Sequence, residues 1–424
     1  MSSLYFGFNS CHDKLYLSQL RDAKKLVQKH DIQVINDYEA RFIETIGKGY
    51  GISIASGRMA FYLLLKHLSI AKGDEVIVVG FTCSVMINAI LRVGATPIYS
   101  DVSPLTFGSD PKAIEGKISV NTKMIVAQHS FGIPCDIEEI VRLGKQHNLF
   151  VLEDCALAIG STIGGVAVGN FGDAAIFSTD HSKPLNTLIG GFFYTTNKKL
   201  FNGIIPLVAN IPELSPIHQK NLFKQLLFEQ KWHSSKKYKF AKVFHYYAKV
   251  IKKLFGKKLL FMDGDNGPPD RIQPKYPYPA KLPCFLAQIG IYELERFESE
   301  KERRMAILNK HLEIFLNSKY KKNIQAVYFD KTISIVPLRF VFLSESTAEL
   351  RSIRSKLSTF IDFSQIWFKR PIIGTNFDLE EMNYCNGDCP IAESIGRSIV
   401  NLPCLIPEHY EKEYFSLLNK NLQV

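Results

Sequence analysis

A lysine and an aspartate near the middle of the chain have the types and the surroundings that Schiff-base chemistry needs. Lys183 lies in the stretch FSTDHSKPLNTLIGG, five residues after Ser178, where a short apolar segment ends. Asp154 ends another apolar run, LFVLED. A lysine amine can form a Schiff base with a carbonyl cofactor, and an acid can keep a pyridinium nitrogen protonated. On neighbouring strand ends, the pair could perform both tasks for pyridoxal phosphate.

Helix-like and strand-like segments alternate from about residue 56 to residue 196. The strand-like segments EVIVV, TPIYSDV, KMIVAQ and LFVLED alternate with the helix-like SGRMAFYLLLKHL, SVMINAILRVG, DPKAIEGKI and DIEEIVRLGKQH. This pattern predicts an α/β fold with a largely parallel sheet covered on both faces. Ligands of such sheets bind beyond the carboxyl ends of the strands. We therefore expect a pocket near four residues at or just past such ends: Phe81, His129, Asp154 and Ser178.

Four of the residues near these strand and helix ends could bind a phosphate or a ring. Ser56 and Gly57 open a predicted helix, where free amides can bind phosphate, although such a pair is commonly only a helix cap. Ser178 could add a hydroxyl to the same phosphate, or it could be a strand-end serine that is satisfied locally. His129 could lie near a bound ring or orient a neighbour, but a hydrogen-bonded structural histidine is the favoured interpretation.

The composition is that of an ordinary globular protein of 424 residues, with 46% hydrophobic and 22% charged residues. No apolar run approaches the roughly 20 residues that span a bilayer. The N-terminus lacks a basic segment followed by an apolar core, so we expect no secretory signal. The eight cysteines are scattered, without CxxC or Cys/His metal spacing. We expect reduced thiols, no metal site and a cytoplasmic protein.

The net charge of +11 is concentrated in one window. Between residues 220 and 260 there are twelve lysines, no arginine and one acid, Glu229, and the rest of the chain is neutral. A local charge gives no reason to expect nucleic-acid binding. In the second of two predicted helices, apolar residues recur at helical spacing between the lysines. We expect this stripe to pack onto the protein; the alternatives are peripheral membrane contact through residues 236–258, an acidic partner or a lipid-linked phosphate substrate.

The chain is expected to form two domains. A large domain over residues 1–284 would carry the cofactor and a basic helical insertion at about 202–275. A small C-terminal α/β domain would cover residues 285–424. It is predicted to begin with a long helix from about Phe285, followed by strand-like segments near 333–343 and 365–368.

Six stretches together resemble the DegT/DnrJ/EryC1/StrS family of pyridoxal-phosphate-dependent sugar aminotransferases. They are ASGRMAF, KGDEVIVVGFT, INAILRVGATPIYSDV, AQHSFGIPCDIEEI, the long segment VLEDCALAIGSTIGGVAVGNFGDAAIFSTDHSKPLNTLIGG and NGDCPIAESIGRSIVNLPC. None is decisive alone, but they occur in the family's order over roughly residues 34–200 and 285–415. The resemblance implies the fold-type I aminotransferase architecture.

The resemblance also implies a role for each candidate residue. Lys183 would form the Schiff base and move a proton between the substrate carbon and the cofactor, and Asp154 would pair with the pyridine nitrogen. Gly57, Arg58 and Ser178 would bind the phosphate. The amine, commonly from glutamate, would pass to a keto sugar, typically nucleotide-linked, for a surface glycan or a secondary metabolite. The family's architecture implies a homodimer in which each site is completed by the other subunit.

Several positions that contact the cofactor in the family carry other residues here. Cys83 replaces the aromatic residue that lies over the cofactor in the family, and Leu157 replaces the glutamine that follows the aspartate. Arg58 replaces the threonine of Ser-Gly-Thr, and Ile189 replaces the glutamate of Gly-Glu-Gly-Gly. The family's Asn-x-Arg element aligns with Pro279 and Lys281. Arg58 could replace lost phosphate contacts, because a guanidinium pairs bidentately with phosphate. We therefore expect a rebuilt cofactor site.

Two other functions stay open. The first is a pyridoxal-phosphate sugar dehydratase of the same superfamily. Those enzymes replace the Schiff-base lysine with histidine, so Lys183 argues against it, while His181 nearby keeps it in view. The second is a catalytically silent relative that acts as a scaffold or regulator through its basic insertion. His129 and His181 are the candidate substrate-binding residues.

Overall fold

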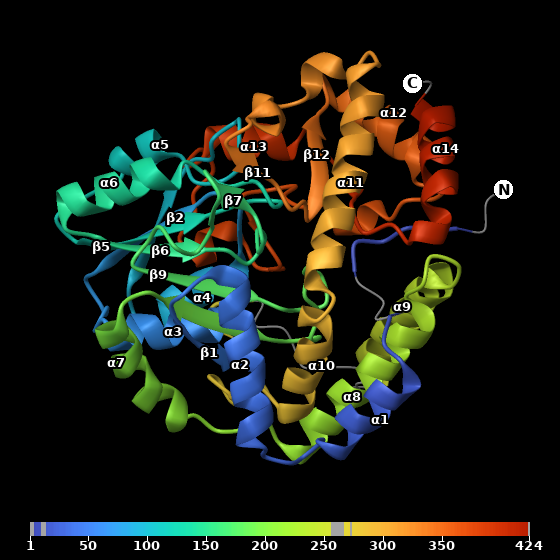
Figure 1. Ribbon diagram of the computed structural model, residues 1–424. Helices are drawn as coiled ribbons and strands as arrows, with labels where there is room; N and C mark the ends of the chain where they lie inside the picture. The colour runs from blue at the N-terminus through green and yellow to red at the C-terminus, as the bar shows by residue number, and fades with distance from the viewer. Residues whose placement is uncertain (1–3, 10–13, 256–266, 272–273, 423–424) are drawn as a thin grey trace.

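A computed structural model describes residues 4–9, 14–255, 267–271 and 274–422 of the chain. Its centre is a seven-stranded sheet with the strand order β1-β10-β9-β6-β5-β2-β4 (Figure 1). The five strands from β9 to β4 are parallel, whereas β10 runs antiparallel to both β9 and β1. The largely parallel sheet predicted from the alternating pattern is confirmed.

The elements of this part follow the predicted segments. The strands are β1 (Tyr50–Ile54), β2 (Glu75–Val79), β4 (Thr96–Ser100), β5 (Thr122–Gln128), β6 (Phe150–Asp154), β9 (Ala174–Ser178) and β10 (Gly191–Thr195). The helices between them are α3 (Gly57–His67), α4 (Ser84–Arg92), α5 (Pro111–Glu115) and α6 (Ile137–His147). The helices α1 (Leu17–Lys25) and α2 (Ile32–Ile46) precede the sheet, and α7 (Lys198–Ala209) follows it.

Helices cover both faces of the sheet, because side chains alternate along each strand. Ile77 and Ile125 belong to the small apolar cluster under α5 and α6, which lie on the left in Figure 1. Val76 and Met124, one residue earlier on the same strands, belong to the larger cluster on the other face. There α3 packs against β9 and β10, and α4 packs against β4.

The chain after residue 284 surrounds a two-stranded antiparallel sheet of β12 (Arg339–Leu343) and β14 (Ile399–Pro403). Its later helices are α12 (Thr347–Leu357), α13 (Pro390–Gly396) and α14 (Glu411–Leu422). Two short pairings join this part to the loops of the large sheet. In the first, β11 (Ile333–Ser334) pairs with β7 (Thr162–Ile163), which also pairs with β8 (Val166–Ala167). In the second, β13 (Ile372–Ile373) pairs with β3 (Thr82–Cys83). Phe6, near the N-terminus, bridges Ile361 of the same part. The domain boundary between residues 284 and 285 stays a prediction.

Two predictions for the C-terminal part are wrong. The long helix is split into α10 (Cys284–Leu294) and α11 (Phe297–Leu316), because the backbone tightens at the end of the first helix, where the Arg296 amide donates to the Glu293 carbonyl at 3.2 Å. Residues 365–368 do not form a strand. The Trp367 amide donates instead to the side chain of Asn401 on β14 at 2.9 Å.

The basic insertion forms the two predicted helices, α8 (Pro216–Trp232) and α9 (Tyr238–Phe255). Helix α8 buries Leu222 and Leu226 against the rest of the protein. Helix α9 is held at its start, where Tyr238 and Ala241 are buried and Lys242 Nζ lies 2.7 Å from Asp362 Oδ1. Of the helices in the described part of the chain, none is long and apolar enough to cross a bilayer.

The expectation that the apolar stripe of α9 packs onto the protein is wrong for most of its described side chains, whereas Val250 and Ile251 are half-buried. Phe240 is 67% exposed, and Phe244 and Tyr247 are exposed as well. The side chain of Phe255 lies outside the described residues. The helix meets the body through Tyr238 and Ala241, and the Phe244 ring lies against Phe228 of α8 with ring centroids 4.9 Å apart. Phe240 and Tyr247 lie on the side that faces solvent.

Candidate active site

A cavity of about 390 Å³ opens at the carboxyl ends of β6 and β9, where the pattern predicted a pocket. Nine of the ten predicted site residues line it: Ser56, Gly57, Arg58, Cys83, Asp154, Leu157, Ser178, His181 and Lys183. The tenth, His129, does not. A larger surface hollow of about 800 Å³, at the amino ends of β5 and β6, contains none of these residues.

One end of the cavity is built to receive an anion. Ser56 precedes α3 without capping it, and its buried Oγ has no hydrogen-bond partner among the described residues. The amides of Met59 and Ala60 bond back to the Ser56 carbonyl, so the two earlier amides lie before the first helical hydrogen bonds. A Cβ on Gly57 would lie 3.0 Å from the Phe177 carbonyl oxygen, so only glycine fits without a shift. Such a helix start binds phosphate.

Arg58 adds a cation beside this helix start. Its Nη2 donates to the Tyr276 hydroxyl at 2.8 Å, and the Tyr278 hydroxyl donates to the Arg58 carbonyl at 3.4 Å. These contacts hold the guanidinium at the cavity wall next to Gly57. The position is consistent with Arg58 replacing phosphate contacts that the family makes with other residues.

Asp154 ends β6 with its carboxylate in the cavity and is only 5% exposed. Burial raises the pKa of Asp154, and three effects oppose the rise: the Ala156 amide, which donates to Oδ1 at 3.0 Å, and the charges of Lys183 and His129. A buried carboxylate is stabilised by a cationic partner. A protonated ring nitrogen in the cavity would supply one.

Lys183 lies in a loop whose two ends, at Thr179 and Thr187, are joined by hydrogen bonds. The Thr187 amide donates to the Thr179 carbonyl at 2.7 Å, and the two threonine hydroxyls lie 2.6 Å apart. Inside the loop, the Lys183 amide donates to the Asp180 carbonyl at 3.0 Å. These bonds fix the backbone from which the lysine side chain, only 7% exposed, enters the cavity.

Asp180 is a cavity residue that the sequence analysis missed. Its Oδ1 accepts hydrogen bonds from the Ser182 amide at 2.8 Å and the Ser182 hydroxyl at 2.6 Å. Burial opposes ionisation, but the charges of Lys183 and His181 and these two bonds outweigh it and lower the pKa of Asp180 to about 2. Asp180 is therefore a permanent anion beside Lys183. The signal was available, since an acid three residues before a candidate lysine lies on the same turn.

Trp367 was also missed, because it comes from the distant C-terminal part. It lines the cavity, and the Lys183 Nζ lies 4.6 Å from its ring centroid. The Arg339 guanidinium lies 4.2 Å from the same ring and donates to Asn401 Oδ1 at 2.9 Å. The Trp367 backbone is therefore fixed by its amide hydrogen bond to Asn401, and its ring lies against the cations of Lys183 and Arg339.

Helix α8 of the basic insertion forms another wall of the cavity. Leu222 and Gln225 line it. Gln225 donates through Nε2 to Oε1 of Glu229, which is 1% exposed, and the His181 ring at the cavity lies 4.0 Å from the same oxygen. Leu222 and Gln225 were not among the predicted site residues, because the lysine-rich composition of the insertion directed attention to its surface.

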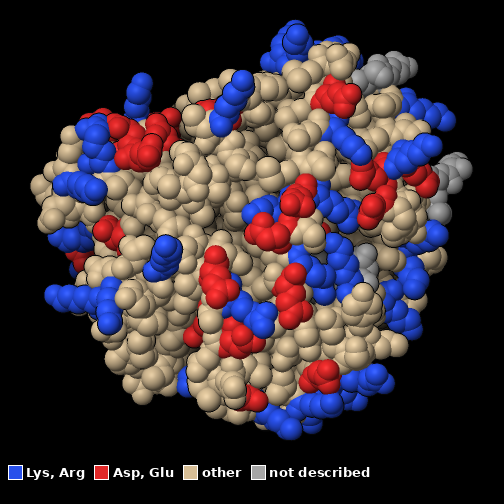
Figure 2. Space-filling view, viewed as in Figure 1, with Lys and Arg blue, Asp and Glu red and all other residues tan. Residues whose placement is uncertain are grey.

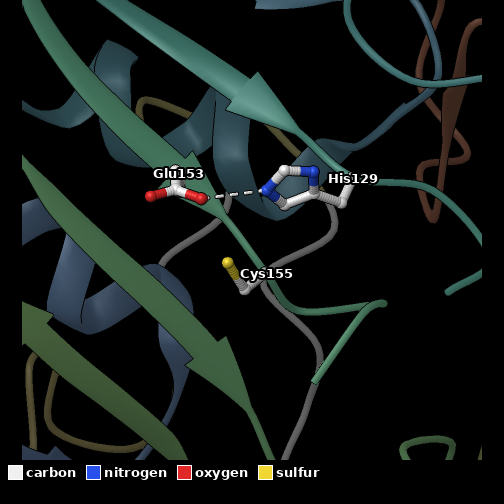
Figure 3. Close-up of side chains that lie close together, drawn as sticks. All are labelled: His129, Glu153 and Cys155. Atoms are coloured by element: carbon white, nitrogen blue, oxygen red, sulfur yellow. Dashed lines mark hydrogen bonds and ion pairs between the residues drawn. The ribbon is translucent and has the colours of Figure 1, made fainter. Parts of the chain in front are cut away.

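His129 is a structural residue, and the expectation that it binds substrate is wrong. It is fully buried outside the cavity. The Cys135 amide donates to Nδ1 at 3.1 Å, so Nε2 carries the proton and donates to Glu153 Oε2, also at 3.1 Å (Figure 3). The His129 amide donates to the Asp154 carbonyl at 3.1 Å. His129 thus supports the strand end that carries Asp154, as the favoured interpretation predicted.

The potential ligand atoms of His129, Glu153 and Cys155 lie within 4.8 Å of one another (Figure 3). Their hydrogen bonds account for the cluster without an ion. The Glu153 oxygens accept from the amides of Gly169, Phe171 and Gly172 at 2.7 to 2.8 Å. Burial raises the pKa of the Cys155 thiol to about 12, so it is not a thiolate.

Comparison with known proteins finds similarity to one family of enzymes. Residues 14–211 match the DegT/DnrJ/EryC1/StrS aminotransferase family. The predicted resemblance to that family is confirmed. Among curated relatives, the GDP-perosamine synthase of Escherichia coli O157:H7 is 40% identical over 190 residues, which cover 45% of this chain and 52% of that protein. The UDP-N-acetyl-3-dehydro-alpha-D-glucosamine 3-aminotransferase of Acidithiobacillus ferrooxidans is 41% identical over 163 residues, or 38% and 44% of the two chains. The chain thus spans about half the length of the curated relatives it matches.

Solved structures extend the likeness to nearly the whole chain. An aminotransferase from Psychrobacter cryohalolentis matches with a TM-score of 0.72 and 20% identity, covering 97% of this chain and 98% of the other. PseC from Helicobacter pylori, an aminotransferase involved in pseudoaminic acid biosynthesis, matches with a TM-score of 0.71 and 18% identity, covering 99% of each chain. The fold-type I aminotransferase architecture is therefore confirmed.

The cavity fits pyridoxal phosphate, the cofactor of this family. The unpartnered Ser56 Oγ and the open amides at the start of α3 suit the phosphate. The buried carboxylate of Asp154 suits the ring nitrogen, and the amine of Lys183 suits the aldehyde. All three groups line one cavity, so the same small molecule can meet them together.

Proposed function

We propose that the protein is a pyridoxal-phosphate-dependent aminotransferase that moves an amino group, from glutamate, to a nucleotide-linked keto sugar. The product would enter a surface glycan or a secondary metabolite. The observation that carries the proposal is the convergence of Lys183, Asp154 and the start of α3 on one cavity.

Each residue has a defined task in this reaction. Bound pyridoxal phosphate supplies an electrophilic aldehyde and an electron-withdrawing ring. Lys183 holds the cofactor through Nζ and, once released, moves the proton at the substrate carbon. Asp154 keeps the ring nitrogen protonated. Ser56, Ser178 and Arg58 bind the phosphate together with the amides at the start of α3.

The sugar substrate is inferred from the relatives. The two curated relatives described above, from Escherichia coli and Acidithiobacillus ferrooxidans, are named for a GDP-linked and a UDP-linked sugar. Another curated relative, from Aneurinibacillus thermoaerophilus, is named as a dTDP-amino-sugar transaminase. The replacements at Cys83, Leu157 and Pro279 alter cofactor contacts and leave the keto substrate to be identified. A lysine at position 183 disfavours the dehydratase, and retention of both Lys183 and Asp154 disfavours a silent scaffold.

Transfer of labelled nitrogen tests the proposal. The purified protein is loaded with pyridoxal phosphate and incubated with nitrogen-labelled glutamate and keto sugars linked to GDP, UDP or dTDP. We expect mass spectrometry to find the label on one of the nucleotide sugars, and Lys183→Ala to abolish the transfer. A protein that binds no cofactor and transfers no label would support the scaffold instead.

We further propose that the protein is a cytoplasmic homodimer, as the family's architecture implies. Pro279 and Lys281 align with the element that reaches the neighbouring subunit's site in the family. In this chain the same segment lies close to the cavity wall: the Ala55 amide donates to the Ala280 carbonyl at 3.0 Å, one residue before Ser56. A second subunit would therefore meet each site near its phosphate end.

Peripheral contact with an anionic membrane through residues 236–258 is part of this proposal. The exposed apolar side chains of α9 recur at helical spacing: Phe240, Val243, Phe244, Tyr247 and Leu254. The only acid between residues 220 and 260 is the buried Glu229, so that window adds only positive charge to the surface. Figure 2 shows blue side chains along the right-hand edge, where α9 runs in Figure 1. An apolar stripe flanked by lysines favours an anionic lipid surface.

Cosedimentation with vesicles tests the membrane contact. We expect binding to anionic but not to neutral phosphatidylcholine vesicles, weakened by salt, because each lysine near the surface adds about 1 kcal/mol. Phe240→Ser with Phe244→Ser should remove binding, whereas Val120→Ser, at an exposed turn outside the insertion, should not. Lys236→Glu and Lys239→Glu should weaken it; the side chains of Lys249, Lys252 and Lys253 lie outside the described residues. Absence of binding at low salt would contradict the contact.

A further inference from the structure

We propose that Trp367 is a cofactor-contacting residue that supplies the aromatic face against which the pyridine ring stacks. This inference rests on the proposed function, since it concerns the cofactor of that reaction. Trp367 belongs to the C-terminal part of the chain, and the family match ends at residue 211. Nothing in that match assigns it a role.

The distance from Lys183 places Trp367 at the cofactor. The Lys183 Nζ lies 4.6 Å from the centroid of the Trp367 ring, and both residues line the same cavity. A cofactor attached to Nζ has its ring carbons within a few bonds of that atom. A pyridine ring held on this atom inside the cavity would be within reach of the indole.

The local topology explains how a distant residue reaches this place. Strand β13 pairs in parallel with β3, so that Ile373 lies opposite Cys83. The C-terminal segment that carries Trp367 thus runs alongside the position where the family usually has an aromatic residue. Cys83 is small, and the cavity beside it is open to Trp367 and Ile373. An aromatic group lost at one strand is supplied by the segment next to it.

The indole is held for such a contact before any ligand arrives. Its backbone amide donates to Asn401 Oδ1 at 2.9 Å, and the Arg339 guanidinium lies 4.2 Å from its ring centroid. Phe368, the next residue, stacks on Phe81 with ring centroids 5.2 Å apart. A ring fixed in advance loses little conformational entropy when another ring stacks on it.

Binding of pyridoxamine 5′-phosphate tests the inference. This probe has an amine in place of the aldehyde, so it forms no covalent bond with Lys183 and reports the non-covalent contacts. We expect Trp367→Leu to weaken its binding to the cofactor-free protein about 3- to 10-fold, and Trp367→Phe to bind nearly as the original protein does. Equal binding by the leucine variant and the original protein would overturn the inference. Failure of the original protein to bind the probe would count instead against the proposed function.

Indole fluorescence gives a readout that does not depend on the leucine variant folding. The chain has two tryptophans, Trp232 and Trp367. In Trp232→Phe the remaining indole should be strongly quenched by pyridoxamine 5′-phosphate, and in Trp367→Phe the remaining Trp232 should be quenched much less. Equal quenching in the two variants would overturn the stacking contact.

Discussion

At the scale of single residues, charge decides what the site can do. Asp154→Asn keeps the shape of the side chain but removes the negative charge that would hold the ring nitrogen protonated. Loss of one partner of a buried ion pair costs about 3–5 kcal/mol, so we expect amine transfer to slow about 10²- to 10⁴-fold. Cofactor binding, followed by its absorbance, should persist. Near-normal turnover of the variant would show that Asp154 is not the partner of the ring.

Asp180 offers a residue-scale prediction about stability and pH. Because its pKa is lowered to about 2 in the folded protein, ionised Asp180 stabilises the fold above its ordinary pKa. That contribution is lost as the pH falls from about 5 through 2. We expect Asp180→Asn to lower the free energy of unfolding of the cofactor-free protein by about 2 kcal/mol at pH 7 and by progressively less in acid. Urea unfolding at several pH values measures this.

Asp330 provides the matched control. Its Oδ1 accepts from the Thr332 amide at 2.8 Å and the Thr332 hydroxyl at 2.6 Å, the same turn that Asp180 makes with Ser182, but at the surface. Asp330→Asn should therefore have a much smaller effect. Equal losses in the two variants would mean that the turn, and not the charge of Lys183, stabilises Asp180.

At the scale of elements, α8 is a wall of the site and not only a support for charge. The side-chain nitrogen of Gln225 donates a hydrogen bond to Glu229. The side-chain oxygen of Gln225 can therefore accept a hydrogen bond from a substrate hydroxyl. Loss of one such hydrogen bond changes binding about 10-fold. We expect Gln225→Ala to raise the KM of the keto sugar by that factor and to leave the reaction with glutamate alone unchanged. Lys224→Ala, exposed on the same helix, is the control. An unchanged KM in Gln225→Ala would remove α8 from substrate recognition.

The same scale shows what the sequence could predict. Asp154, Ser56 and Ser178 were found because each ends a strand or precedes a helix, and Lys183 because it follows the strand end at Ser178 by five residues. A parallel sheet brings such ends to one edge. Trp367 and Gln225 could not be found in this way. Their places depend on pairings between distant segments, β13 with β3 in one case and the docking of α8 in the other. The break between α10 and α11 carries no proline or glycine, so the helical pattern runs through it.

At the scale of the whole molecule, the proposed homodimer can be tested directly. Sedimentation at micromolar concentration should show a dimer. The Pro279 and Lys281 segment would lie near its interface, so Lys281→Glu should weaken the dimer and activity together. A monomer with full activity would contradict the homodimer, while a dimer that dissociates on loss of Phe240 and Phe244 would assign the α9 stripe to subunit contact and not to a membrane.

The most direct test of the central claim is to locate the cofactor on the chain. Protein loaded with pyridoxal phosphate should show a visible absorption band that borohydride removes, because reduction fixes the Schiff base. Mass spectrometry of the digested protein should then find the phosphopyridoxyl group on Lys183, and Lys183→Ala should fold but carry no label. A label on another lysine, or a protein that stays colourless with excess cofactor, would contradict the account.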